Sequence, residues 1–180
     1  MMTSTEIILF ADPVLDATQS TIAKDLRLNL KRILHESSLT VEEGHLALMA
    51  LATAVEYGAL KEFAGTMLKE LGFAEEQIRE AAESSAIMAM LNTYYRFRYM
   101  VNKDQDYATA GLRMTSLARP ALGKEKFEML AFAISVLNGC QSCVRSHEEV
   151  LRNTGFSTEK IHDLARLASV VKALKTLTTV

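Results

Sequence analysis

The feature that most restricts the fold of this chain is an internal repeat. Gly155-Phe156 lies 83 positions after Gly72-Phe73, and the same shift aligns further positions without a gap. The aligned pairs are Leu39 with Leu122, Ala50 with Ala133, Leu68 with Leu151, Glu76 with Glu159, Ile78 with Ile161, and Ala82 with Ala165. Because similarity at a fixed period indicates a repeated structural unit, we predict a single domain over residues 1–180 with two similar halves, about residues 39–100 and 122–177.

Apolar residues spaced three or four positions apart predict helices in both halves. The chain is rich in Ala, Leu, Met, Glu and Lys, has two prolines, and shows no sustained strand alternation, which favours helix throughout. We therefore expect an all-α helical bundle of about eight helices, with caps at Asp12-Pro13 and at the Thr40–Glu43 capping box. The expected ranges are about 13–36, 41–57, 60–71, 74–102, 104–117, 124–137, 140–153 and 157–176, with Gly58 ending the second helix.

Both cysteines of the chain lie in one stretch of the second half. Cys140 and Cys143 are separated by two residues and follow Asn138-Gly139, which we expect to form a turn before a helix. The free N–H groups and the positive dipole end of a first helical turn favour a thiolate there. Residues three positions apart share one helix face, so this pair is placed to close a disulfide.

Two further side chains complete a candidate proton relay. His147 follows Cys143 by four positions, so it lies one turn further along the same helix face. Glu128 precedes Cys140 by twelve positions, and a helical hairpin about Gly139 brings it close to His147. A carboxylate beside an imidazole raises the basicity of the ring and fixes its tautomer. The spacing therefore predicts a relay from Glu128 through His147 to Cys143.

The first half has none of these groups at the matching positions. Tyr57, Leu60 and Ala64 correspond to the two cysteines and the histidine, and His45 corresponds to Glu128. We interpret His45 as a partly buried scaffold histidine. The repeat thus predicts that one half carries the chemistry and the other is scaffold.

A dithiol of this kind leaves several reactions open. It can attack a peroxide oxygen, form a sulfenic acid and be resolved to a disulfide, or it can exchange disulfides with other thiols. Cys140, Cys143, His147 and Glu128 could instead ligate zinc, although structural zinc sites usually contain more sulfur. The net charge of −2 without a basic cluster argues against general nucleic-acid binding.

The combination of Glu128, the Cys140-x-x-Cys143 pair and His147 in a helical chain of this length resembles the alkyl hydroperoxidase D (AhpD) family. That family belongs to the carboxymuconolactone decarboxylase-like superfamily. The resemblance implies an AhpD-like fold and a thiol-dependent peroxidase, an antioxidant alkyl hydroperoxide reductase that binds no haem, flavin or metal cofactor. It implies that Cys143 is the nucleophile that becomes a sulfenic acid, Cys140 the resolving thiol, His147 the general base, and Glu128 its relay partner.

The resemblance also implies partners and an assembly. The disulfide would be reduced by dihydrolipoamide carried on a lipoylated acyltransferase subunit, the enzyme would serve a peroxiredoxin, and the chain would form a homotrimer. One position departs from the family pattern. Family members carry a histidine directly before the second cysteine, where this chain has Ser142.

Two other function classes stay open from the sequence. One is a carboxymuconolactone decarboxylase-like lyase on the same scaffold, which needs no dithiol, and the other is a non-enzymatic redox-sensing or zinc-binding interaction module. The N-terminus lacks the basic region of a signal peptide, and no run of about 18 apolar residues occurs. We therefore expect a cytoplasmic protein with no membrane span.

Overall fold

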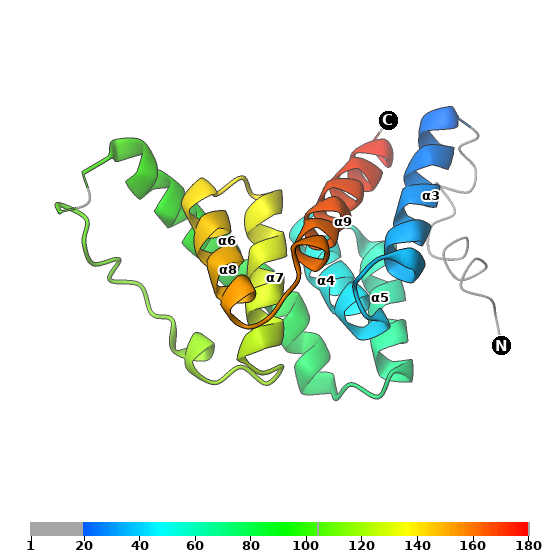
Figure 1. Cartoon of the computed structure of the whole chain (residues 1–180), viewed down its shortest axis with the longest axis horizontal. Coiled ribbons are helices and arrows are strands. Elements are labelled where there is room, and N and C mark those ends of the chain that lie inside the picture. Colours follow the sequence, from blue (N-terminus) through cyan, green and yellow to red (C-terminus); the bar gives the residue numbers. More distant parts are fainter. Residues whose placement is uncertain (1–19, 104, 180) are drawn as a thin grey trace.

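The computed structural model describes residues 20–103 and 105–179, and within these ranges it is helical, with no strand (Figure 1). The elements are α3 (Thr21–Glu36), α4 (Val41–Ala54), α5 (Gly58–Glu70), α6 (Glu75–Val101), the 3-10 helix η1 (Thr115–Ala118), α7 (Lys124–Leu137), α8 (Gln141–Asn153) and α9 (Thr158–Leu177). The all-α prediction is confirmed. The predicted helix start at Asp12-Pro13 lies outside the described residues.

Local capping signals place two of the helix starts where the sequence predicts them. The N–H of Glu43 donates to Thr40 Oγ1 at 3.2 Å, and the N–H of Thr40 donates to the Glu43 carboxylate at 2.8 Å, which completes the capping box of α4. Ser157 Oγ accepts from the N–H of Lys160 at 3.1 Å at the start of α9. Each cap satisfies N–H groups that have no partner inside the helix.

The predicted role of Gly58 is wrong, because this glycine begins α5 and does not end α4. Helix α4 ends at Ala54, and the chain reverses at Glu56, whose φ of 56° is left-handed. Two hydrogen bonds close that end of the helix, from the N–H of Glu56 to the Thr53 carbonyl and from the N–H of Tyr57 to the Ala52 carbonyl. A side chain is therefore tolerated at a position that usually favours glycine.

The predicted helix over residues 104–117 is also wrong for the part that the structure describes. Residues 105–114 form no helix, and only the short η1 follows. None of residues 105–121 is buried, so a helix here would have no apolar face to pack. Short helices depend on such packing for most of their stability. A composition that favours helix is therefore not enough to stabilise a helix in this segment.

Helices α4 and α7 form the centre of the bundle. Nearly all of α4 from Gly44 to Ala52 is buried, and in α7 every residue from Met129 to Ser135 is buried. The two helices pack on each other, α5 and α6 cover α4, and α8 and α9 cover α7. The long α6 reaches both halves, since it contacts α4 and α5 as well as α7 and α8 (Figure 1). A helix that is apolar all round is stable only when neighbours surround it.

The helix bounds follow the spacing of the sequence repeat. Adding 83 to the bounds of α4 gives those of α7, the same shift takes α5 onto α8, and it takes the first residue of α6 onto that of α9. Gly72 and Gly155, also 83 apart, both adopt a left-handed backbone, with φ of 84° and 97°. The helices of the two halves therefore recur at the interval of the sequence repeat, and the duplication itself stays a prediction.

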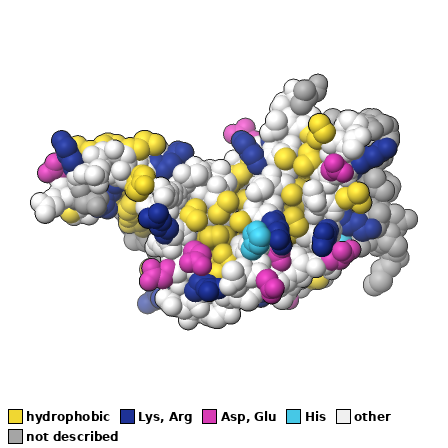
Figure 2. All heavy atoms as spheres, turned by 45° about the horizontal axis from the view of Figure 1, so that its top comes forward, with side chains coloured by type: hydrophobic (Ala, Val, Ile, Leu, Met, Phe, Trp, Pro, Cys, Tyr) yellow, Lys and Arg dark blue, Asp and Glu magenta, His cyan; other side chains and the backbone are white. Residues whose placement is uncertain are grey.

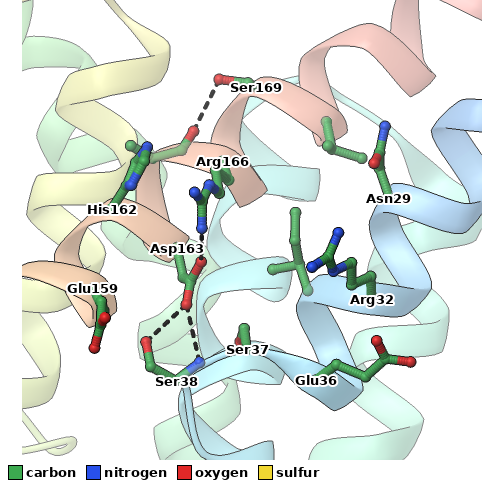
Figure 3. Close-up of a pocket in the computed structure, with 13 residues that line it drawn as sticks. Asn29, Arg32, Glu36, Ser37, Ser38, Glu159, His162, Asp163, Arg166 and Ser169 are labelled. Carbon is green, nitrogen blue, oxygen red and sulfur yellow. Dashed lines mark hydrogen bonds and ion pairs between the residues drawn. The ribbon is translucent and has the colours of Figure 1, made fainter.

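A polar contact ties the turn before α4 to α9, beside a cavity of about 790 Å³ between α3 and α9 (Figure 3). The Asp163 carboxylate accepts from the N–H and hydroxyl of Ser38 at 2.9 and 2.7 Å, and from Arg166 at 2.7 Å. Burial acts to raise the pKa of Asp163, but these hydrogen bonds together lower it. The contact therefore stabilises the fold while Asp163 is ionised.

We predict that His45 makes the fold acid-sensitive. His45 is 1% exposed, and its Nδ1–H donates to the Val41 carbonyl at 2.7 Å. Burial lowers its pKa, more than the bond to Val41 raises it. The unfolded chain takes up a proton below about pH 6.5, so the stabilisation is complete above that pH and is lost as the pH falls below it.

Denaturant unfolding followed by circular dichroism between pH 5 and pH 8 measures this effect. We expect the free energy of unfolding of the wild type to fall towards pH 5, and His45→Gln, which cannot titrate, to lose part of that dependence. An unchanged pH dependence in His45→Gln would contradict the prediction.

Candidate redox site

The α7–α8 hairpin places both cysteines at the start of α8. Helix α7 ends at Leu137, and Gly139 reverses the chain with a left-handed φ of 64°. Cys140 is the N-cap residue of α8, and its N–H donates to the Ser135 carbonyl at 3.1 Å. Only glycine enters the left-handed region without steric cost, so the Asn138-Gly139 pair accounts for the position of the turn.

The two cysteines form a disulfide across the first turn of α8. The Cys140 and Cys143 sulfurs are 2.06 Å apart, and their Cα atoms are 5.3 Å apart, a separation that a disulfide commonly spans. Both side chains are buried, at 0% and 7% exposure. Ser142 has its Oγ 3.7 Å from the Cys140 sulfur. A disulfide sulfur carries no proton, so this hydroxyl is the donor.

Glu128 and His147 meet across the hairpin. His147 Nδ1 lies 2.7 Å from Glu128 Oε2, and the side chains are 20% and 32% exposed. An ionised carboxylate only accepts hydrogen bonds, so the Nδ1–H of the imidazole donates to it. This fixes the tautomer of the neutral ring, leaving Nε2 free to accept a proton. His147 lies four positions after Cys143 on α8, on the same helix face.

A cavity of about 390 Å³ opens beside this pair. Glu128 and His147 lie in its wall, and most of the remaining wall is apolar. The apolar residues that line it are Met88, Leu91, Leu117, Pro120, Phe127, Ala131 and Val150. Ligand pockets are commonly mostly apolar with a few polar groups. The sequence carried no signal for this cavity, because α6 and the segment before α7 supply much of its wall.

The sequence gives only a weak indication of a polar contact between α6 and α7, next to the Asn138-Gly139 turn. Asn92 of α6 is 1% exposed and donates through Nδ2 to the hydroxyl of the buried Ser135 at 2.9 Å. Each residue is a polar position among largely apolar buried residues of its helix. Such positions can be noticed in a sequence, but their partners on another helix cannot be identified.

The geometry gives no support to the zinc interpretation. In the part of the chain that the structure describes, no three or more His, Cys, Asp or Glu side chains are grouped as metal ligands would be. The cysteines are joined to each other, and Glu128 is bonded to His147. The four residues are arranged as two pairs.

Comparisons with known proteins give one family profile and several similar chains. The profile of the carboxymuconolactone decarboxylase family matches residues 106–179. The chain is 39% identical over 164 residues to a protein of Anaeromyxobacter dehalogenans named alkyl hydroperoxide reductase AhpD, covering 88% of this chain and 87% of that protein. Proteins of the same name from Rhizorhabdus wittichii and Streptomyces coelicolor are each 36% identical, covering 93% and 89% of this chain and 94% and 92% of theirs.

We predict that the two thiols of the reduced protein disappear together when peroxide is added. A sulfenic acid on one cysteine is attacked at once by a thiol held within disulfide range. Alkylation and mass spectrometry should find two free thiols before oxidation and none after it, with no metal released. Cys140→Ser should instead accumulate a sulfenic acid on Cys143. Loss of one thiol only in the wild type, or release of zinc, would contradict this prediction.

Proposed function

Because the chain belongs to the alkyl hydroperoxidase D (AhpD) family of the carboxymuconolactone decarboxylase-like superfamily, we propose that it is an alkyl hydroperoxide reductase. Such an enzyme reduces organic hydroperoxides to alcohols with a pair of cysteine thiols. The observation that carries the proposal is the Cys140–Cys143 disulfide, which starts the same helix on which His147 is bonded to Glu128.

The first step is the attack of a thiolate on the peroxide. The Cys143 thiol gives its proton to His147 Nε2, and Glu128 stabilises the imidazolium that results. The thiolate attacks the terminal oxygen of the hydroperoxide, so an S–O bond forms as the O–O bond breaks. The leaving alkoxide takes up the proton and departs as an alcohol. Cys143 is then a sulfenic acid, oxidised by two electrons.

The second step closes the disulfide. The Cys140 thiol attacks the sulfenic sulfur of Cys143, the S–S bond forms, the S–O bond breaks, and water leaves. Dihydrolipoamide then returns both thiols by exchange and becomes the cyclic disulfide. In sum, one hydroperoxide and one dihydrolipoamide give one alcohol, one water and one lipoamide. The structure corresponds to the oxidised protein before reduction.

The N-terminus of α8 favours this chemistry. Cys140 is the N-cap residue and Cys143 lies in the first turn, where unpaired N–H groups and the helix dipole stabilise negative charge. That environment lowers the pKa of a thiol towards neutrality in comparable sites. A larger fraction of nucleophilic thiolate is therefore available for the attack.

The cavity beside Glu128 and His147 supports an organic substrate. Its wall is mostly apolar, and Met88 and Leu91 are themselves 2% and 6% exposed. An alkyl group gains free energy by leaving water for such a surface, whereas hydrogen peroxide has no apolar part to bury.

Two alternatives have less support. A lyase on this scaffold would fit the superfamily, but it has no need of a cysteine pair. A redox-sensing module would contain the same disulfide, but it would not reduce hydroperoxides catalytically. The turnover experiment below therefore separates both alternatives from the peroxidase.

The partners and the assembly are part of the same proposal. The dihydrolipoamide would be carried on a lipoylated acyltransferase subunit, and a peroxiredoxin would receive electrons from the dithiol. We place the protein in the cytoplasm, where these partners and reduced thiols occur. Among the helices described, none combines the length and apolar character needed to cross a bilayer.

A homotrimer would cover apolar surface that one chain leaves exposed. On the face shown in Figure 2, acidic and basic side chains are interspersed, and apolar side chains also reach the surface. The end of α6 and the segment after it carry several large exposed apolar residues: Phe97 at 40%, Tyr99 at 54%, Met100 at 77% and Tyr107 at 38% exposure. Clustered apolar surface of this kind is typical of protein contacts.

We expect catalytic reduction of an alkyl hydroperoxide such as cumene hydroperoxide, with dihydrolipoamide as a better reductant than thioredoxin or glutathione. Cys143→Ser should abolish turnover because it removes the nucleophile. His147→Ala should slow it by about 100-fold, a usual loss for a general base. His45→Gln is the control for the loss of a histidine, since it changes one in the half without thiols, and it should leave turnover unchanged. Turnover that survives Cys143→Ser would overturn the proposed function.

We also expect light scattering to give a mass near three times the 19.9 kDa of one chain. The double substitution Tyr99→Glu with Met100→Glu should lower that mass, because it would place charge in an apolar contact. Leu28→Glu on α3, where the leucine is 63% exposed, is the control and should keep the trimer. A monomeric wild type would contradict the proposed assembly.

A further inference from the structure

Behind the redox turn, four polar side chains form a contact that we call the turn clamp: Asn92 and Arg96 of α6, Ser135 of α7, and Asn138 of the turn. We propose that Asn92 and Arg96 are positioning residues that hold the Asn138-Gly139 turn and thereby favour the Cys140–Cys143 disulfide over the open dithiol. The inference deepens the proposed function, on which it rests in taking the cysteines as a reversible redox pair.

The bonds of the turn clamp run from α6 to the turn. Asn92 Nδ2 donates to Ser135 Oγ at 2.9 Å, and Asn92 Oδ1 accepts from Asn138 Nδ2 at 3.0 Å. Arg96 Nη1 donates to the Asn138 carbonyl at 2.9 Å. Asn92 and Ser135 are 1% and 0% exposed, so little water competes for these bonds. The turn is thus bound to α6 through both the side chain and the backbone of Asn138.

The clamp reaches Cys140 through the backbone. Ser135, whose hydroxyl binds Asn92, is also the residue whose carbonyl accepts the N–H of Cys140. Asn138 lies two positions before Cys140 in the same turn. A shift of the turn therefore moves the first cysteine relative to the second, which lies within α8.

The first half of the molecule provides an internal comparison. Its turn between α4 and α5 has the same backbone bond, from the N–H of Tyr57 to the Ala52 carbonyl at 2.8 Å, and the same left-handed residue, Glu56. Ala52 and Val55 occupy the positions of Ser135 and Asn138, so neither side chain can make the clamp bonds. A turn of this shape forms without a clamp, and shaping the turn does not account for the polar cluster.

What distinguishes the second turn is the disulfide that follows it. Burying amide and hydroxyl groups in an apolar core costs free energy unless every group is bonded, and of the two matching turns only the one beside the cysteines has such a buried, bonded cluster. When the disulfide opens, the covalent link across the first turn of α8 is lost, and the clamp remains to hold Cys140 near Cys143. Two thiols held in place re-form their disulfide more readily than two that move apart.

The test is the dithiol–disulfide equilibrium of the purified protein in glutathione buffers, read by alkylation and mass spectrometry. We expect Asn92→Ala to shift the equilibrium constant about tenfold towards the dithiol, which is about 30 mV in potential. Asn138→Ala removes the Asn92–Asn138 bond by changing its partly exposed partner, so it should shift the equilibrium constant in the same direction. It also provides the test if Asn92→Ala does not fold. Their double substitution should add little to the effect of Asn92→Ala, because the Asn92–Asn138 bond is already lost in that variant.

Ser84→Ala is the matched control. Ser84 lies on the same helix, is 1% exposed, and its hydroxyl donates to the Ala81 carbonyl at 2.7 Å, away from the turn. It should leave the equilibrium constant unchanged whatever it does to stability. Wild-type equilibrium constants in folded Asn92→Ala and Asn138→Ala would overturn the positioning role alone. A wild-type disulfide that neither glutathione nor dihydrolipoamide reduces would overturn the proposed function as well.

Discussion

The burial of α7 is the constraint on which the rest of the site depends. Its residues from Met129 to Ser135 are all buried, so the helix can neither rotate nor slide without exposing apolar surface. This fixes Glu128 at one side of the buried run and Asn138 at the other. Helix α8 is different, since only Cys143 and Leu151 within it are buried. The redox helix is therefore held on the bundle by its turn, by Leu151 and by the Glu128–His147 bond.

The two halves show how one scaffold supports different chemistry. Glu128 is partly exposed and bonded to His147 on the neighbouring helix, whereas His45, at the matching position, is buried and bonded to its own helix at Val41. Ala64 replaces His147 in the first half, so no imidazole lies at that position to bond His45, and burial lowers the pKa of His45. A few substitutions in one half thus separate a hydrogen-bonded Glu–His pair from a buried structural histidine.

Local signals predicted most helices well, and they failed where tertiary packing decided the outcome. The capping box at Thr40 and the serine cap at Ser157 start their helices as predicted, because such caps act within four residues. Gly58 was misassigned because Glu56 takes the left-handed position. The helix expected over 104–117 is missing from residues 105–114 because none of these residues is buried, so apolar packing cannot stabilise a helix there. Neither packing nor backbone reversal can be read from composition.

The sequence by itself determined the helical class, because periodicity and composition are local properties. It also determined the spacing that brings Glu128 near His147 and the cysteine pair at a helix start, because both depend on separations along one hairpin. The tertiary structure alone decided that Asn92 of α6 reaches Ser135 and Asn138, and that an apolar cavity opens beside His147. These features join segments more than 40 positions apart. Contacts between residues so far apart in the sequence depend on how whole helices pack. No local sequence pattern predicts which helix faces will contact each other.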